Sequence, residues 1–165
     1  MRDVAYEEYM NTSPYVETLG AHADLGLLLP AASAASFLEE TVPRLTARDL
    51  GEAMAIRVFA WNRSVFGQPL FRLPDADSCV YIALLRAPMT DPTAQARAVA
   101  GNRTLFDRVV QLGGTLYPYA ALELTRSDWR RHYAGEWSSL MAAKRRYDPC
   151  DVFASGPDLG LNAST

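Results

Sequence analysis

Four short stretches with alternating apolar side chains are separated by two helix-forming stretches, and this order limits the folds open to the chain. The stretches follow one another as strand, helix, strand, strand, helix, strand, at 22–30, 31–46, about 53–61, 78–86, 91–114 and 115–122. This order is that of the split βαβ, ferredoxin-like fold. It predicts an α+β domain with an antiparallel sheet, two helices packed on one face, and a C-terminal helical segment over 125–149.

Length and charge narrow the class of protein further. The chain has 165 residues, of which 49% are hydrophobic, and this suits one compact domain, expected over 21–165 after an N-terminal arm or lid over 1–20. A net charge of -3 gives no reason to expect nucleic acid or an anionic membrane as a partner. We find no apolar run long enough to span a membrane and no secretory signal, so we expect a cytoplasmic protein with reduced Cys79 and Cys150.

Side chains alternate along a strand, so each predicted strand divides into two sets that face opposite ways. One set is uniformly apolar and is expected under the helices: Leu25, Leu27, Leu29, Met54, Ile56, Val58, Ala60, Val80, Ile82 and Leu84. The other set mixes aromatic and ionisable side chains: His22, Asp24, Leu28, Arg57, Phe59, Trp61, Tyr81, Ala83, Tyr117, Tyr119 and Ala121. A face that only meets solvent would carry mainly Lys, Glu, Ser and Thr.

This second face has two interpretations of about equal weight. Residues 1–20 and the C-terminal helices could cover it as a second core, with Asp24 and Arg57 as a structural ion pair. Alternatively, it is a ligand site, because convergent polar groups among aromatic side chains are typical of small-molecule sites. Under that hypothesis the catalytic candidates are Asp24, Arg57, Tyr117 and Tyr119, and the substrate-binding candidates are His22, Leu28, Phe59, Trp61, Tyr81, Ala83 and Ala121.

Metal and triad chemistry have no support in the sequence. His22 and His132 lie far apart, and no spacing of His, Cys or Glu matches a metal site. No Gly-x-Ser-x-Gly turn occurs, so nothing supports a Ser-His-Asp triad. We therefore expect no metal, and we expect structural roles for both histidines, with a minor catalytic role left open for His22.

The C-terminal stretch SDWRRHYAGEWSSLMAAKRRYDPCDVFASGPD resembles the end of FAD-linked oxidases of the vanillyl-alcohol oxidase superfamily, in particular cytokinin dehydrogenases, with berberine bridge enzymes as further relatives. The matching residues are Trp129, His132, Tyr133, Trp137, Lys144, Tyr147, Asp148 and Pro149. The stretches HADLGLLLP, RVFAWNRS, YIALLRA and GGTLYPYAAL resemble that family's strands in the same order.

The resemblance implies a substrate-binding, or cap, domain whose sheet forms the roof over the flavin ring. It also draws attention to departures: Asp24 and Gly26 replace a substrate-contacting Trp and Asn, and the final turn is Ser155-Gly156-Pro157. No glycine-rich pyrophosphate loop occurs, so we expect a freestanding cap domain without FAD.

Three hypotheses for function remain after this step. The first is a cofactor-independent cyclase or isomerase of secondary metabolism, acting on a large hydrophobic intermediate such as a polyketide. In it, Arg57 would hold a carboxylate or enolate of the substrate. Tyr117 or Tyr119 would donate a hydrogen bond to a carbonyl, and Asp24 would act as a base. The second is a binding subunit that pairs with a separate FAD subunit or with a second copy, through the open sheet face or its edge. The third, an excised oxidase domain, fits the changed Trp-Asn pair least well.

Overall fold

The sheet and its helices have the predicted order. The computed structural model describes residues 22–50, 55–150 and 152, so the predicted arm over 1–20 lies outside the described residues. The elements are β1 (Leu25–Pro30), α2 (Ala31–Thr41), η1 (Val42–Arg44), α3 (Ala47–Leu50), β2 (Ala55–Asn62), η2 (Arg63–Val65), β3 (Ser78–Leu85), α4 (Pro92–Gln111), β4 (Thr115–Ala120), α5 (Arg126–Tyr133), η3 (Ala134–Glu136) and α6 (Trp137–Tyr147).

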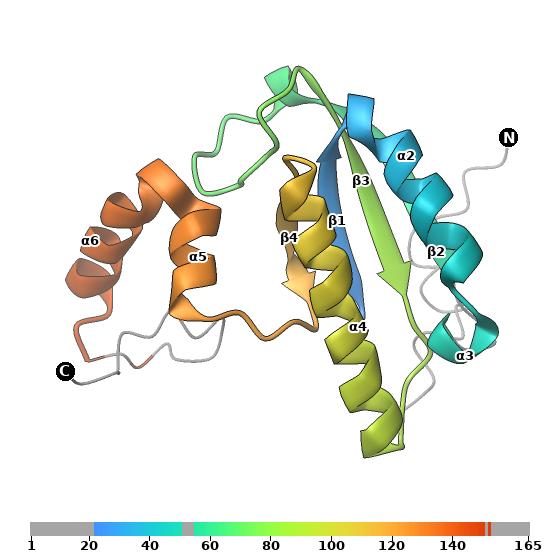
Figure 1. The fold of residues 1–165 in the computed structure, drawn as a ribbon. Coiled ribbons are helices and arrows are strands. Elements are labelled where there is room, and N and C mark those ends of the chain that lie inside the picture. The colour runs from blue at the N-terminus through green and yellow to red at the C-terminus, as the bar shows by residue number, and fades with distance from the viewer. Residues whose placement is uncertain (1–21, 51–54, 151, 153–165) are drawn as a thin grey trace, which may run out of the picture.

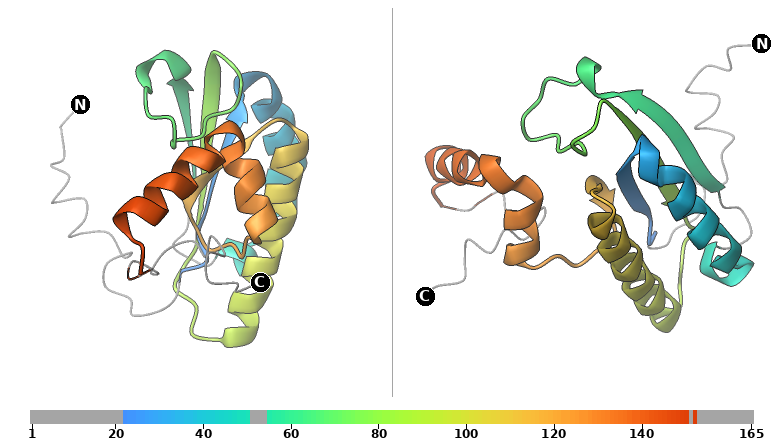
Figure 2. Two further views of the ribbon diagram at one scale, coloured as in Figure 1. Left: turned by 90° about the vertical axis from the view of Figure 1, so that its left-hand side faces the viewer. Right: turned by 45° about the horizontal axis from the view of Figure 1, so that its top comes forward.

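The four strands form one antiparallel sheet in the order β2-β3-β1-β4. The helices α2 and α4 lie against one face of this sheet, as Figures 1 and 2 show. The core between them contains Leu25, Leu27 and Leu29 of β1, with Phe37, Ile82, Leu84, Phe106, Val109 and Leu116. The predicted apolar residues of β1 and β3 are buried or half-buried, but Val58 and Ala60 of the edge strand β2 are exposed, so the prediction that they lie under the helices is wrong; Met54 lies outside the described residues. The α+β, ferredoxin-like prediction is confirmed.

Helix boundaries follow local chemistry. The side chain of Asp91 accepts a hydrogen bond from the Thr93 amide at 2.9 Å, and Pro92 occupies the first position of α4. The same helix ends before Gly113, whose φ of +77° suits glycine. Ser33 does not cap α2, because that helix begins after Pro30, and the Ser33 hydroxyl instead donates to the Leu112 carbonyl.

The C-terminal helical segment stands beside the β4 edge (Figures 1 and 2). Its break falls where the sequence suggests, since the turn η3 separates α5 from α6 around Gly135. Lys144 and Asp148 pair across the last turn of α6, and the Asp148 carboxylate also accepts the Val152 amide. Among the described helices, none combines the length and apolar character that crossing a bilayer requires.

Candidate functional site

Aromatic rings gather on the sheet face that α2 and α4 leave uncovered. We call Trp61, Phe66, Phe71, Tyr81 and Tyr117 the aromatic cluster. Trp61 stacks on Tyr81 with ring centroids 5.1 Å apart, and Tyr81 meets Tyr117 at 5.0 Å. Phe66 and Phe71 come from the loop between β2 and β3 and contact Trp61 and Tyr117, with centroids at 5.2 and 5.8 Å. Three of the five rings were predicted for this face, and the two loop phenylalanines were not.

The strand register explains why these rings meet. Tyr117 lies opposite Gly26, and Tyr81 lies opposite Leu28 on the other side of β1. A Cβ atom on Gly26 would approach Cβ of Tyr117 to 3.0 Å and Cε2 of Tyr81 to 3.2 Å. Glycine at this position therefore lets the two tyrosines close over β1. Leu28 and Ala83 are buried on this face.

The loop between β2 and β3 is fastened across this face by polar contacts. Thr115 of β4 donates its hydroxyl to the Arg72 carbonyl at 2.7 Å, and Nε of Arg72 donates to the His132 carbonyl at 3.3 Å. Arg63 donates to the Pro74 carbonyl within the same loop. The loop thus joins β4 to α5 and holds its phenylalanines on the cluster.

A cavity of about 740 Å³ opens next to the cluster, where β1 begins and β4 ends. We call it the Asp24 hollow. Its polar lining is His22, Asp24, Tyr119 and Glu123, and its apolar lining is Leu116, Pro118, Ala120, Ala121, Leu122, Leu124 and Trp129. Asp24 precedes β1, two residues from Gly26, and Tyr119 lies two residues from Tyr117 on β4, so this end of the hollow adjoins the cluster. Its other lining residues include Leu116 and Trp129 of the core.

The Asp24 carboxylate accepts hydrogen bonds from the residue that follows β3 and from β4. One carboxylate oxygen accepts the Arg86 amide at 2.7 Å, and the other accepts the Tyr119 hydroxyl at 3.4 Å. The Asp24 side chain is buried, with the whole residue 3% exposed, whereas Tyr119 is 56% exposed. His22 contributes Nδ1, which lies 3.1 Å from the Arg86 carbonyl. The hollow therefore combines a fixed carboxylate with an accessible phenol.

The buried arginine of this region is Arg86 rather than Arg57. Arg57 lies on the edge strand β2 and is exposed, so the expected cost of burying its charge does not apply. Arg86 is 3% exposed, donates from Nη1 to the Ala23 carbonyl, and donates from Nε to the Asp49 carbonyl at 2.9 Å. Burial lowers the pKa of Arg86, and these carbonyl contacts replace the water it has lost.

Asn102 of α4 ties the ends of two strands together beneath the hollow. Its Nδ2 donates to the carbonyls of Ala23 and Ala121 at 3.1 and 2.8 Å, and the residue is fully buried. This amide fixes the start of β1 against the end of β4. A single polar residue within a long helix gives no sequence signal for such a contact.

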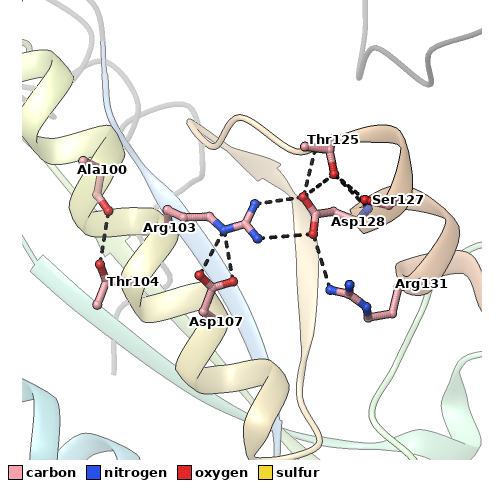
Figure 3. A network of polar contacts seen from close by, with 8 residues as sticks. All are labelled: Ala100, Arg103, Thr104, Asp107, Thr125, Ser127, Asp128 and Arg131. Carbon is pink, nitrogen blue, oxygen red and sulfur yellow. Dashed lines mark hydrogen bonds and ion pairs between the residues drawn. The ribbon is translucent and has the colours of Figure 1, made fainter.

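Trp129 forms a wall of the hollow, and an ion-pair network holds its helix in place (Figure 3). Arg103 of α4 makes two hydrogen bonds to Asp128 of α5, at 2.8 and 3.2 Å, and also pairs with Asp107. Asp128 and Thr125 form a capping box at the start of α5. The hydrogen bonds from Arg103 hold the pKa of Asp128 well below its usual range.

His132 is buried in this helical segment between the rings of Trp129 and Tyr133, with centroids at 5.7 and 4.9 Å. Burial, aided by the charge of Arg72, lowers its pKa to about 4, so the imidazole is neutral at pH 7. This placement supports the structural role expected for it. The described residues contain no group of three or more His, Cys, Asp or Glu positioned for a metal.

The described helices do not fit the pyrophosphate of FAD, the cofactor that the resemblance implies. Carboxylates already occupy the starts of α4 and α5, where Asp91 and Asp128 accept backbone amides, and α6 follows Glu136. The helix α2 begins directly after Leu29 and Pro30, with no glycine to let a phosphate approach. Within the described part of the chain, no helix start is suited to the dinucleotide.

Comparison with known proteins adds the family. The family described as "Cytokinin dehydrogenase 1, FAD and cytokinin binding" matches residues 3–159. An uncharacterized oxidoreductase, ORF5 of the fasciation locus of Rhodococcoides fascians, is 33% identical over 135 residues, which cover 82% of this chain and 30% of that protein. Cytokinin dehydrogenase 1 of Oryza sativa subsp. japonica is 27% identical over 172 residues, covering 96% of this chain and 31% of that protein.

The chain thus spans about a third of the length of the curated relatives it matches. Its match to the family nevertheless runs over nearly all of its own residues, including every described strand and helix. The resemblance inferred from the strand and tail motifs agrees with this match. The chain belongs to the family described as "Cytokinin dehydrogenase 1, FAD and cytokinin binding".

Proposed function

We propose that this domain is the substrate-binding part of an FAD-linked oxidoreductase. In this proposal a flat, mostly apolar molecule lies against the aromatic cluster, and its polar end enters the Asp24 hollow. The observation that carries the proposal is the Tyr119–Asp24 contact in the lining of a 740 Å³ cavity, with Tyr119 two residues from Tyr117 of the aromatic cluster. Cavities of this size with an apolar lining and a few fixed polar groups are typical of small-molecule sites.

The chemistry of the site favours a planar nitrogen heterocycle. Such a ring stacks on tyrosine and tryptophan, as the cluster's own rings do. The exposed phenol of Tyr119 donates its hydrogen bond to Asp24, so its oxygen can accept an N–H group of the ligand, and a carboxylate such as Asp24 also accepts N–H donors. The names of the family and of the rice relative point to cytokinins for those proteins, and a ligand of that class agrees with this site.

The flavin would be held outside the described residues, by another part of the protein or by another chain. Two observations support this: the helix starts do not fit a pyrophosphate, and the relatives are about three times as long as this chain. FAD would supply the hydride acceptor for oxidation. The residues of this domain would bind the substrate, orient it and exclude water.

A cofactor-independent cyclase or isomerase for a large hydrophobic, polyketide-like intermediate remains a second candidate. Asp24 and Tyr119 favour it, because a fixed carboxylate and an accessible phenol in one cavity could move a proton during ring closure. Arg57 lies on the same face, opposite Ala83, which in turn lies opposite Gly26. In this mode it would hold a carboxylate or enolate of the substrate.

Calorimetric titration with 6-benzylaminopurine tests the first candidate. We expect saturable binding that Tyr119→Phe weakens about tenfold, since one lost hydrogen bond is worth about 1.4 kcal/mol. Tyr147→Phe is the control, because Tyr147 is exposed at the end of α6, away from both the cluster and the hollow. Absence of binding, or equal affinity in both variants, would contradict the proposed site.

The two candidates separate in one further assay. Incubation with polyene substrates in the absence of flavin should give no cyclised product if the domain is a binding part of an oxidoreductase. Cyclisation that is lost in Asp24→Asn would instead favour the second candidate. Self-pairing through the open face or the β2 edge, where Val58 and Phe59 are exposed, stays a prediction for measurement of mass in solution.

A further inference from the structure

Three arginines line a second, smaller cavity that shares no lining residue with the Asp24 hollow, although the backbone of Arg86 contacts Asp24 and His22. It measures about 260 Å³, and its lining comes from the end of η1, from α3, from α4 and from the residues that follow β3. Its lining contains Arg44, Arg86, Arg97 and Asp49, with Leu45, Met89, Ala94, Ala98, Gly101, Thr104 and Leu105. We call it the arginine pocket.

The pocket carries an excess of positive charge. Its three guanidinium groups face one carboxylate, that of Asp49, which already accepts the amide and hydroxyl of Thr46 at 2.8 and 2.6 Å. These two hydrogen bonds, and then the charges of Arg86 and Arg97, lower the pKa of Asp49. Asp49 is held by Thr46, Arg44 is close to Glu40, and Arg86 lies near the charge of Asp24 as well as that of Asp49. Arg97 has no such close ion pair among the described residues, so the pocket keeps an excess of positive charge.

Two of the arginines have unused hydrogen-bonding capacity. Arg97 makes no hydrogen bond or ion pair with the described residues. Arg86 uses Nε and Nη1 for backbone carbonyls, while its Nη2 has no partner among the same residues, although Arg86 is almost fully buried. Arg44 pairs with Glu40 only at 3.8 Å, and its side chain is largely exposed and able to reorient.

We infer that the arginine pocket binds the oxyanion group, phosphate or carboxylate, of a small molecule. Guanidinium groups recognise such groups through paired, charge-assisted hydrogen bonds. Arg86 supplies a donor held rigidly by Asp49 and Ala23, and Arg97 supplies a mobile one. Leu45, Met89 and Leu105 give room for a small apolar body attached to the anion. The site is separate from the proposed substrate site.

The test is calorimetric titration with inorganic phosphate, phenyl phosphate and benzoate, at an ionic strength held constant with sodium chloride. We expect one-to-one binding of at least one of the three. Arg97→Gln should weaken it at least fivefold while leaving the melting temperature without ligand unchanged. The matched control is Arg145→Gln, an exposed arginine of α6 outside the pocket. Arg86 is not substituted, because it also holds Ala23 and Asp24 in place.

The three probes distinguish the anion. Tighter binding of phenyl phosphate than of inorganic phosphate would show that the pocket prefers a phosphomonoester and that its apolar side chains contact the phenyl ring. Tighter binding of benzoate would show that it prefers a carboxylate. No saturable binding of any probe would overturn the inference. Equal loss of affinity in Arg97→Gln and Arg145→Gln would also overturn it, because binding would then follow overall charge rather than this pocket.

Discussion

Replacing Asp128 with alanine tests how the C-terminal helical segment is attached to the sheet domain. The substitution removes two hydrogen bonds from Arg103, the contact from Arg131, and one half of the capping box with Thr125. Breaking a buried ion pair costs roughly 3–5 kcal/mol. Here Asp128 is 5% exposed but Arg103 is 37% exposed, so water can still reach the arginine left behind. We take roughly 1–2 kcal/mol for the pair and about 1 kcal/mol for the cap.

The expected loss in the free energy of unfolding is therefore about 2–3 kcal/mol, measured by urea denaturation at pH 7. Asp107→Ala is the matched control, because it removes the other carboxylate on Arg103 from the same helix and is 48% exposed. It should cost only about 0.5 kcal/mol. Hydrogen exchange of the α5 and α6 amides should accelerate in the first variant and not in the second. If the two variants lose the same stability, the bidentate pair does not anchor the segment.

The pH dependence of the same pair has a definite sign. The folded-state pKa of Asp128 is depressed, so its contribution is complete above the ordinary value of 3.8 and is lost as the pH falls below it. The contribution of the Arg103–Asp128 pair to the free energy of unfolding is therefore constant near neutral pH. We expect it to add no pH dependence of stability between pH 5 and 8.

Two further predictions concern a histidine and a glycine. His132 has a pKa of about 4 in the folded state against 6.5 in the unfolded state, so the unfolded chain binds the proton first and stability falls as the pH drops from 6.5 to 4. His132→Phe should flatten this pH dependence of the free energy of unfolding, measured by urea titration at several pH values. An unchanged pH dependence would assign it to another group. Gly26→Ala should cost roughly 1–3 kcal/mol and alter the near-UV circular dichroism of the cluster, because its Cβ crowds Tyr81 and Tyr117. Gly101→Ala, in open space on α4, should instead stabilise by about 0.5–1 kcal/mol, and the opposite order of the two would refute the packing argument.

The sheet could be predicted because its alternation is local. Leu25, Leu27 and Leu29 occupy every second position, and this pattern alone assigns one face to the core. Asp91-Pro92 and Gly113 likewise mark the ends of α4 through short-range chemistry. Order of elements, helix ends and the identity of the buried face therefore follow from residues close together in the chain.

The site depends on contacts between distant residues, and these were predicted only in part. Phe66 and Phe71 lie in a loop without periodicity, so nothing local indicates that they join the cluster. Arg57 was placed on the correct face, but the position of β2 at the sheet edge, which exposes it, depends on strand order. Arg86 had one available signal, a lone charge that closes the apolar strand YIALL.

Residues of the C-terminal stretch and of the candidate site show the same difference between local contacts and contacts between distant residues. Lys144 and Asp148, which match the tail of the resembling family, pair across the last turn of α6. Asp24 was singled out because the strand alternation places it on the aromatic face, and it also replaces an aromatic residue of the resembling family. The structure places it in a cavity with His22, Tyr119 and Ala121, whereas Trp61, Tyr81 and Tyr117 form the adjoining cluster. Whether these residues bind a ligand is the central proposal.

The most direct test follows the three tryptophan indole N–H signals by ¹H–¹⁵N NMR during titration with 6-benzylaminopurine. Trp61 belongs to the cluster and Trp129 lines the hollow, whereas Trp137 packs against the core and lines neither. The account predicts saturable shifts for Trp61 and Trp129, with Trp137 nearly unmoved. Shifts confined to Trp137, or no shifts at ligand saturation of the solution, would contradict a substrate site on this face.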